Sequence, residues 1–188
     1  MVKSVVCLVL VIMLSACSTV AEKPFADYQL VKLQHLQQQG RWAFEGRLAL
    51  VDEKDSVSAS ISWRHTEEQD DIELTGPLAQ GRLAISVTPD RVVIDDGDNR
   101  QEYRGRADAV VAEQLGMDMP VNALKYWVLG INDPDQAFLE QDGGFFQNGW
   151  LIRFREMQKV NSEWLPKRMT AQKDKTRIKL IVDQWDLS

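Results

Sequence analysis

The sequence predicts a mainly β fold with some α-helix, in which a single curved antiparallel sheet carries helices over its concave face. Most of the chain after residue 40 alternates apolar and polar side chains with a period of two, which is typical of strands with one buried face. Two segments of helical spacing interrupt this pattern, and alternating strands resume after them. Strands on both sides of a helical insertion usually share one sheet, so the helices are available to cover its apolar face.

Residues 1–16 have the features of a secretory signal peptide rather than of a fold element. The apolar run from Val5 to Leu14 is shorter than the ~18–20 residues that a membrane-spanning helix needs. The letters LSAC at 14–17 fit a lipobox, in which Cys17 receives S-diacylglycerol and, after cleavage, an N-acyl chain. An ordinary cleavage site followed by a spare cysteine is the alternative.

Cleavage before Cys17 would leave a lipidated N-terminus and a short polar tether at 17–24, followed by one domain at 25–188. Ser18 favours sorting to the outer membrane, because Asp at this position favours retention in the inner membrane. We therefore expect an outer-membrane protein that is lipid-anchored and faces the periplasm. Its 28 acidic against 22 basic side chains argue against nucleic acid and against electrostatic binding to anionic membrane.

The expected elements follow from the two periodicities. Leu30, Leu33 and Leu36 recur before Gly40 and predict an amphipathic helix. Val110, Val111 and Leu115, and later Leu124, Trp127 and Val128, predict helices that end at glycines. The predicted strands are 41–51, 56–64, 71–75, 82–88, 91–96, 149–157 and 176–187, and the two inserted helices are 107–115 and 120–129.

The sequence contains no recognisable catalytic constellation. His35 and His65, the two histidines, lie on different predicted elements without other ligands at metal-binding spacing. No nucleophile motif, zinc-protease motif, phosphate loop or dinucleotide fingerprint is present. We therefore expect no enzyme, no metal and no cofactor other than the lipid on Cys17. A periplasmic enzyme acting on lipids or cell wall is the disfavoured alternative.

Five of the six tryptophans lie on predicted apolar faces: Trp42, Trp63, Trp127, Trp150 and Trp185. Two interpretations stay open. Each indole is an ordinary core residue, or the aromatic sheet lines a binding cavity, since such pockets are mostly apolar with few polar groups.

A set of segments in this order resembles the LolB group of the LolA/LolB lipoprotein-localisation family. The segments are GRWAFEGRLAL, the serine-rich strand that ends at Trp63, LTGPLAQG, LGMDMPVNALKYWVLG, NGW, LPKRM and IKLIVDQW. The resemblance implies a half-barrel of antiparallel strands with a helical lid over a hydrophobic cavity. It also implies a monomer that takes lipoproteins from a periplasmic LolA-like carrier, binds their acyl chains and inserts them into the inner leaflet of the outer membrane.

The resemblance assigns roles to particular residues. Pro77 and Leu78 match a loop whose exposed leucine inserts into the membrane, although Ala79 replaces the usual glycine. The alternative is that Leu78 folds back onto the sheet edge. The candidates for the acyl-chain cavity are Trp42, Phe44, Ile61, Trp63, Leu74, Ile85, Leu124, Trp127, Trp150, Ile152, Leu180 and Trp185. A sensory or structural lipoprotein that binds lipid or lipoprotein with a related half-barrel is the alternative function.

Overall fold

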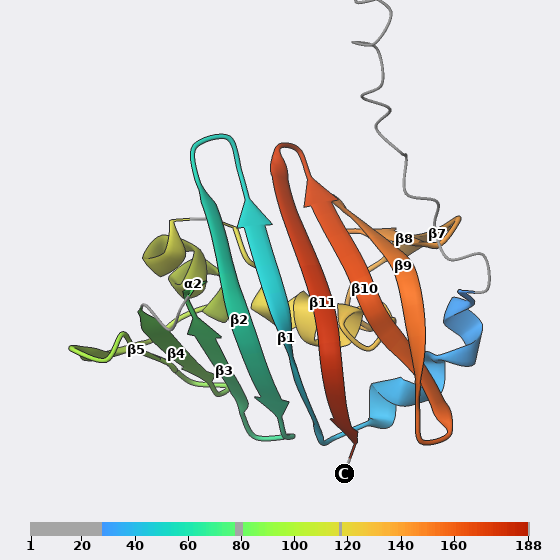
Figure 1. The fold of residues 1–188 in the computed structure, drawn as a ribbon, viewed down its shortest axis with the longest axis horizontal. Coiled ribbons are helices and arrows are strands. Elements are labelled where there is room, and N and C mark those ends of the chain that lie inside the picture. Colours follow the sequence, from blue (N-terminus) through green and yellow to red (C-terminus); the bar gives the residue numbers. More distant parts are fainter. Residues whose placement is uncertain (1–27, 78–80, 117, 188) are drawn as a thin grey trace, which may run out of the picture.

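The computed structural model describes residues 28–77, 81–116 and 118–187, and these form one open antiparallel sheet with helices against one face (Figure 1). The sheet has 11 strands in the order β6-β5-β4-β3-β2-β1-β11-β10-β9-β8-β7. The mainly β class and the single curved sheet are thus confirmed. The strands are β1 (Trp42–Val51), β2 (Ser56–His65), β3 (Asp70–Thr75), β4 (Arg82–Val87), β5 (Val92–Asp95), β6 (Arg100–Tyr103), β7 (Phe138–Gln141), β8 (Gly144–Gln147), β9 (Trp150–Val160), β10 (Glu163–Lys173) and β11 (Thr176–Leu187).

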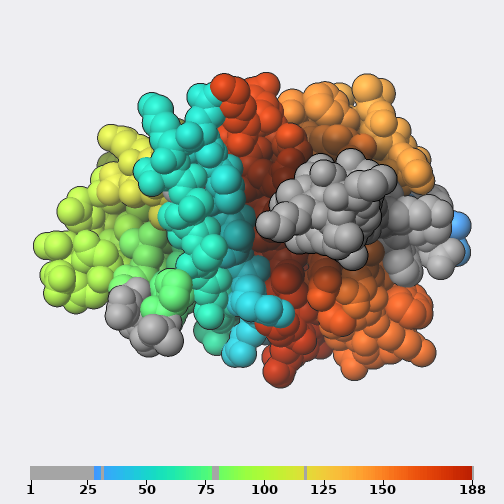
Figure 2. All heavy atoms as spheres, turned by 45° about the horizontal axis from the view of Figure 1, so that its top comes forward, coloured from blue at the N-terminus to red at the C-terminus, as the bar shows by residue number. Residues whose placement is uncertain are grey.

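Two α-helices cover the concave face of the sheet. In Figure 1, α3 (Val121–Trp127) crosses behind β1 and β11, and α2 (Ala107–Leu115) lies to the left of β2. Both occupy the segments predicted to be helical, and Gly116 ends α2 in the left-handed conformation at φ 70°. Figure 2 shows the β1–β2 and β10–β11 hairpins side by side, with the α2 segment beside the first. The apolar side chains of the strands and those of the two helices therefore pack together in one apolar interior.

The amphipathic helix predicted over residues 25–40 was wrong for the part that the structure describes. Two short 3-10 helices occur there instead, η2 (Leu30–Lys32) and η3 (Gln34–Gln38). Leu30, Leu33 and Leu36 are all buried. A spacing of three places side chains directly above one another in a helix with three residues per turn, so the leucine pattern suits 3-10 geometry.

Four strands had no counterpart in the prediction: β6, β7, β8 and β10. The first three are only four residues long, and the side chains of β7 are exposed on both faces, so no alternation marks it. In β10 the alternation fails because the register with β9 shifts between Pro166 and Met169. A bulge changes which face the following side chains point to, so a period of two is lost.

A second irregularity lies between β1 and β11, where the register shifts at Glu45/Gly46. The shift lets Val182 and Trp185 point to the same buried face although they are three residues apart. A Cβ on Gly46 would lie 2.2 Å from the Ile181 carbonyl oxygen, so only glycine permits this approach. The bulge therefore decides where Trp185 packs.

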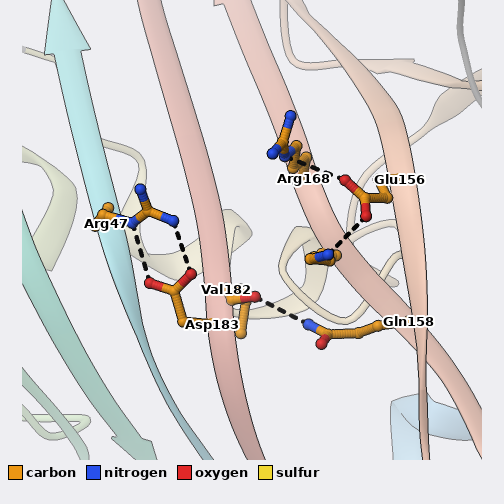
Figure 3. Close-up of polar contacts among 7 residues, drawn as sticks. Arg47, Glu156, Gln158, Arg168, Val182 and Asp183 are labelled. Carbon is orange, nitrogen blue, oxygen red and sulfur yellow. Dashed lines mark hydrogen bonds and ion pairs between the residues drawn. The ribbon is translucent and has the colours of Figure 1, made fainter.

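Polar side chains on the convex face cover both irregularities (Figure 3). Arg47 donates two hydrogen bonds to Asp183, of 3.0 and 2.8 Å, and this interaction lowers the pKa of the Asp183 carboxyl. Glu156 accepts from Lys167 Nζ at 2.7 Å and lies 3.1 Å from Arg168 Nε.

The amide of Gln158 on β9 reaches the β11 backbone, since its Nε2 donates to the Val182 carbonyl at 3.0 Å (Figure 3). The bulged carbonyl therefore has a partner although the regular ladder is interrupted.

Candidate functional site

The interior under β1, β2 and β11 holds a cluster of four packed rings, Trp42, Phe44, Trp63 and Trp185, which we call the sealed cluster. Ring centroids lie 5.6 Å apart for Trp42 and Trp63, and 5.2 Å apart for Phe44 and Trp185. All four side chains are buried. Trp42 and Phe44 are stacked, and the other ring pairs meet in tilted or edge-on geometries, so this part of the interior is closely packed.

Two indole N–H groups of the sealed cluster, those of Trp63 and Trp185, have partners within the protein. Asp70, itself buried, accepts a 2.9 Å hydrogen bond from Trp63 Nε1, and its Oδ1 lies 2.7 Å from His65 Nδ1. Trp185 Nε1 donates to the Pro166 carbonyl at 3.2 Å. The indole N–H groups of Trp63 and Trp185 are therefore satisfied without water, which fits a closed core.

A pocket of about 540 Å³ opens beside this interior, where α3 faces the β8–β9 turn, the start of β9 and the end of β10. Its apolar wall includes Met119, Trp127 and Trp150, and the two indole rings lie 6.0 Å apart. We call it the rim pocket. Its full lining is Arg106, Asp108, Asp118, Met119, Pro120, Asn122, Ala123, Trp127, Asp133, Gln136, Asn148, Trp150 and Lys173.

One buried amide, Gln147, holds the wall of the rim pocket together. Its Oε1 accepts from Trp127 Nε1 and from the Asp133 N–H, both at 2.9 Å. Its Nε2 donates to the carbonyls of Asp133 at 2.9 Å and Gln136 at 3.0 Å. A fully bonded buried amide fixes its neighbours in one arrangement, so α3 and the segment before β7 keep a constant relation.

Charged groups of both signs surround the mouth of the rim pocket. Lys173 Nζ lies 5.9 Å from the centre of the Trp150 ring and 3.9 Å from Asp118 Oδ2. Burial raises the pKa of the Asp133 carboxyl, with the Asp135 amide acting in the opposite direction. Asp108 on α2 accepts the Asn122 N–H at 3.0 Å and so ties α2 to α3. The pocket therefore combines a small apolar wall with a lining in which polar and charged side chains predominate.

All twelve predicted cavity residues lie in the apolar interior and are buried. Trp127 and Trp150 also line the rim pocket. Sequence reasoning missed Gln147, Asp133 and Lys173, because an isolated polar residue in a strand or turn carries no periodic signal. Gln147 stands directly before the NGW segment that contributed to the family resemblance, and this was the one available hint.

The predicted membrane loop is described only at its ends. The Gly76 N–H donates to the Gly81 carbonyl at 3.0 Å, which closes the loop at its base, and Pro77 is exposed. Pro77 borders a shallow groove of about 360 Å³ on the outer face, together with Ala49 and Ile181. Leu78, Ala79, Cys17, Ser18, the signal peptide and the tether lie outside the described residues.

The described residues bring together no group of three or more His, Cys, Asp or Glu side chains that would hold a metal ion. His35 instead pairs with Glu163 at 2.9 Å, far from His65 and Asp70 in the chain. No helix within the described ranges is both long enough and apolar enough to cross a membrane.

The sequence and the fold of this chain have counterparts among known proteins. The family model "Outer membrane lipoprotein LolB" matches residues 40–185. The chain belongs to this family. The outer-membrane lipoprotein LolB of Chromohalobacter salexigens is 29% identical over 191 residues, 96% of this chain and 88% of that protein. Its namesake in Alkalilimnicola ehrlichii is 29% identical over 187 residues, 94% of this chain and 93% of the relative.

Solved structures share the fold at low sequence identity. A LolA superfamily protein from Nitrosomonas europaea superposes with a TM-score of 0.51 at 10% identity, over 85% of this chain and 91% of its own. A DUF1329 family protein from Desulfovibrio piger has a TM-score of 0.54 at 6% identity, with 85% and 90% covered. The predicted family and outer-membrane location are thus confirmed, together with a role in lipoprotein localisation.

Proposed function

We propose that this outer-membrane protein takes lipoproteins from a periplasmic LolA-like carrier, binds their acyl chains against the concave face of its sheet and passes them to the inner leaflet. The observation that carries the proposal is the continuous apolar interior beside the rim pocket. Trp127 and Trp150 belong to both, so an acyl chain that passes the charged mouth of the pocket would reach the aromatic side chains of the interior.

The free energy of the cargo explains why such an interior is needed. An acyl chain of some fifteen methylenes gains roughly 12 kcal/mol on burial, at about 0.8 kcal/mol per methylene, so it does not cross water unprotected. Burial against side chains such as Ile152 and Leu124 replaces burial in a membrane or carrier with a similar apolar environment.

Entry of a chain requires the helical cover to move, because the concave face is filled in the described arrangement. α2 packs on the interior through Val110 and Val111 and has no side-chain cap at its N-terminus. An acyl chain can therefore take the place of this helix against the sheet with little loss of hydrogen bonding. Because Asp108 bonds to the Asn122 N–H, we expect α2 and α3 to respond together.

No catalytic step is part of this proposal. Transfer proceeds from the carrier to this chain because the acceptor binds the acyl chains more tightly, and no nucleotide motif is found in the sequence. Cys17, carrying S-diacylglycerol and an N-acyl chain, anchors the domain close to the leaflet that receives the cargo. Ser18 directs the protein to that membrane.

The proposal is tested by loading the lipid-free protein with a hydrophobic fluorescent probe and adding purified lipoprotein. We expect stoichiometric probe binding that lipoprotein displaces. A protein without an internal probe site would contradict the acceptor role, whereas probe binding that free lipid displaces and lipoprotein does not would support the sensory alternative.

The loop role of Leu78, carried by the match of Pro77 and Leu78 to the family segment, has a separate test. A Leu78→Glu variant should still bind lipoprotein but deliver less of it to outer-membrane vesicles, because a carboxylate at the loop tip resists entry into lipid. Val57→Glu is the matched control, since Val57 is an exposed apolar residue on a different hairpin. Equal delivery by both variants would exclude a membrane role for Leu78.

A further inference from the structure

The two edges of the sheet differ in chemistry. β6 forms one edge with the sequence RQEY, in which Arg100, Gln101 and Glu102 are exposed. Arg100 Nη1 lies 3.8 Å from Asp95 Oδ2, and Glu102 Oε2 lies 3.7 Å from Arg91 Nη1. A charged edge of this kind opposes pairing with another strand.

The opposite edge, β7, has the sequence FLEQ and presents apolar side chains to solvent. Leu139 is 64% exposed, and its cross-strand partner Phe146 on β8 is 40% exposed. Phe146 is paired in turn with Leu151 on β9, so the three side chains form a short apolar row on the outer face. Among the described strands, none pairs with the outer side of β7, which is the last strand of the sheet.

β7 is held in place by the rest of the fold. Gln147 bonds the carbonyls of Asp133 and Gln136 in the segment that leads into the strand. A Cβ on Gly144 would lie 1.9 Å from the Ile152 carbonyl oxygen, so β8 approaches β9 closely and fixes the β7–β8 hairpin. An edge that is already ordered loses little conformational freedom when it binds a partner.

The charge around β7 indicates the chemistry of its partner. Between Lys125 and Arg153 the chain carries four acidic side chains, Asp133, Asp135, Glu140 and Asp142, and no basic one. Asp135 and Asp142 are exposed close to β7 in the chain, and Glu140 is exposed on the face of β7 opposite to Leu139, because its cross-strand partner is the buried Phe145. Basic side chains on an incoming strand would complement this acidic edge, and its apolar side chains would cover Leu139 and Phe146.

We propose that β7 pairs with an extended segment of a partner protein that alternates apolar and basic side chains. The main-chain hydrogen bonds of β7 supply binding, and the acidic and apolar side chains around it select the segment. This interaction uses the outer edge of the sheet and not the concave interior, so it stands or falls independently of acyl-chain binding.

The test uses the full mature chain and a short fluorescent peptide of alternating valine and lysine, with fluorescence anisotropy as the readout. We expect saturable binding and slower amide hydrogen exchange at Phe138–Gln141. A Leu139→Lys variant should bind at least about tenfold more weakly, because it loses apolar contact and adds a like charge. Gln101→Lys, at the opposite edge, should bind as the parent does.

Two further probes separate strand pairing from nonspecific attraction. A peptide of alternating valine and glutamate should bind much more weakly than the valine–lysine peptide. In a Glu140→Gln variant, the difference in affinity between the two peptides should be smaller. A lysine peptide with N-methylated backbone amides should not bind.

The proposal is overturned by any of four results. These are absence of binding by the lysine peptide, retained binding after N-methylation, equal effects of Leu139→Lys and Gln101→Lys, and slow exchange of the β7 amides without peptide. The last result would mean that a segment of the chain itself already covers the edge.

Discussion

Two groups of tryptophans in this protein have the same sequence signature and different surroundings. Trp42, Trp63 and Trp185 pack with Phe44 in the sealed cluster, while Trp127 and Trp150 form one wall of the rim pocket. Each lies on an apolar face, and each face was predicted from periodicity. The comparison teaches that periodicity identifies the buried face of an element, whereas the elements opposite it decide whether that face meets core or pocket.

The largest effect is expected from opening the sealed cluster with Trp63→Ala. Trp63 is fully buried, so the variant removes a large ring from packed surroundings and leaves Asp70 without its indole donor. We expect a loss of about 3–5 kcal/mol in the free energy of unfolding, measured by urea denaturation. Trp164→Ala is the control, because Trp164 is 53% exposed; equal losses would show that the cluster is not sealed.

The next effect concerns the bulge that brings Trp185 into the sealed cluster. Gly46→Ala places a Cβ against the Ile181 carbonyl and should lower the unfolding free energy by about 1–3 kcal/mol. Near-ultraviolet circular dichroism should change as well, since Trp185 loses its packing on Phe44. Gly40→Ala, whose added Cβ would meet only the flexible side chain of Glu67, controls for the loss of a glycine. An unchanged aromatic spectrum in Gly46→Ala would contradict this origin for the packing of Trp185.

A smaller effect is expected on the pocket side. Trp127→Phe keeps a ring in the wall but removes the hydrogen bond to Gln147, which should reduce stability by about 1 kcal/mol. The hydrogen exchange of the Asp133 amide should also become faster, because its acceptor is less firmly held. If the Asp133 amide exchanges as in the parent, Gln147 does not organise this wall.

The smallest expected effect is on the pH dependence of the unfolding free energy, which two carboxyls, Asp133 and Asp183, should change in opposite directions. Burial raises the folded pKa of Asp133, so its contribution to stability is full below the unfolded value of about 3.9 and is lost as the pH rises through the folded pKa. The Asp133→Asn variant has no carboxyl to ionise at this position, so it does not lose stability in this way as the pH rises. The unfolding free energy of the variant relative to the parent should therefore increase from acidic to neutral pH.

Asp183 supplies the matched control because the hydrogen bond from Arg47 lowers its pKa. Its contribution is present above the unfolded value and is lost as the pH falls through the folded pKa. Asp183→Asn should therefore become less stable relative to the parent as the pH rises, in urea titrations at several pH values. The same trend in both variants would contradict the assignment of the pKa directions.

Most of the fold could be predicted because alternation and helical spacing report burial directly. The strands around Phe44, Trp63 and Leu180 and the helix containing Trp127 follow from these patterns. β10 escaped prediction because its bulge near Arg168 breaks the alternation, and β7 because neither of its faces is buried. Both depend on pairing with distant segments, which a local pattern does not contain.

The candidate site was predictable in its apolar part only. The twelve cavity candidates lie in the interior. The alternation pattern predicts that both Trp150 and Trp42 are buried, but it does not show that Trp150 lies at the pocket and Trp42 in the sealed cluster. The polar part depends on Gln147, Asp133 and Lys173, which come from three separate segments. These three residues come together because of the order of the strands in the sheet, which the sequence of any one segment does not reveal.

The most direct test of the central claim is tryptophan quenching by a lipoprotein whose acyl chains carry bromine. Bromine quenches only rings that it contacts, so the readout reports where the chains lie. The account predicts quenching in the parent and in Trp164→Phe, and a marked reduction in Trp150→Phe, because Trp150 lines the entrance to the interior. Equal quenching in Trp150→Phe and the parent, or no quenching in the parent, would contradict binding of the acyl chains at this site.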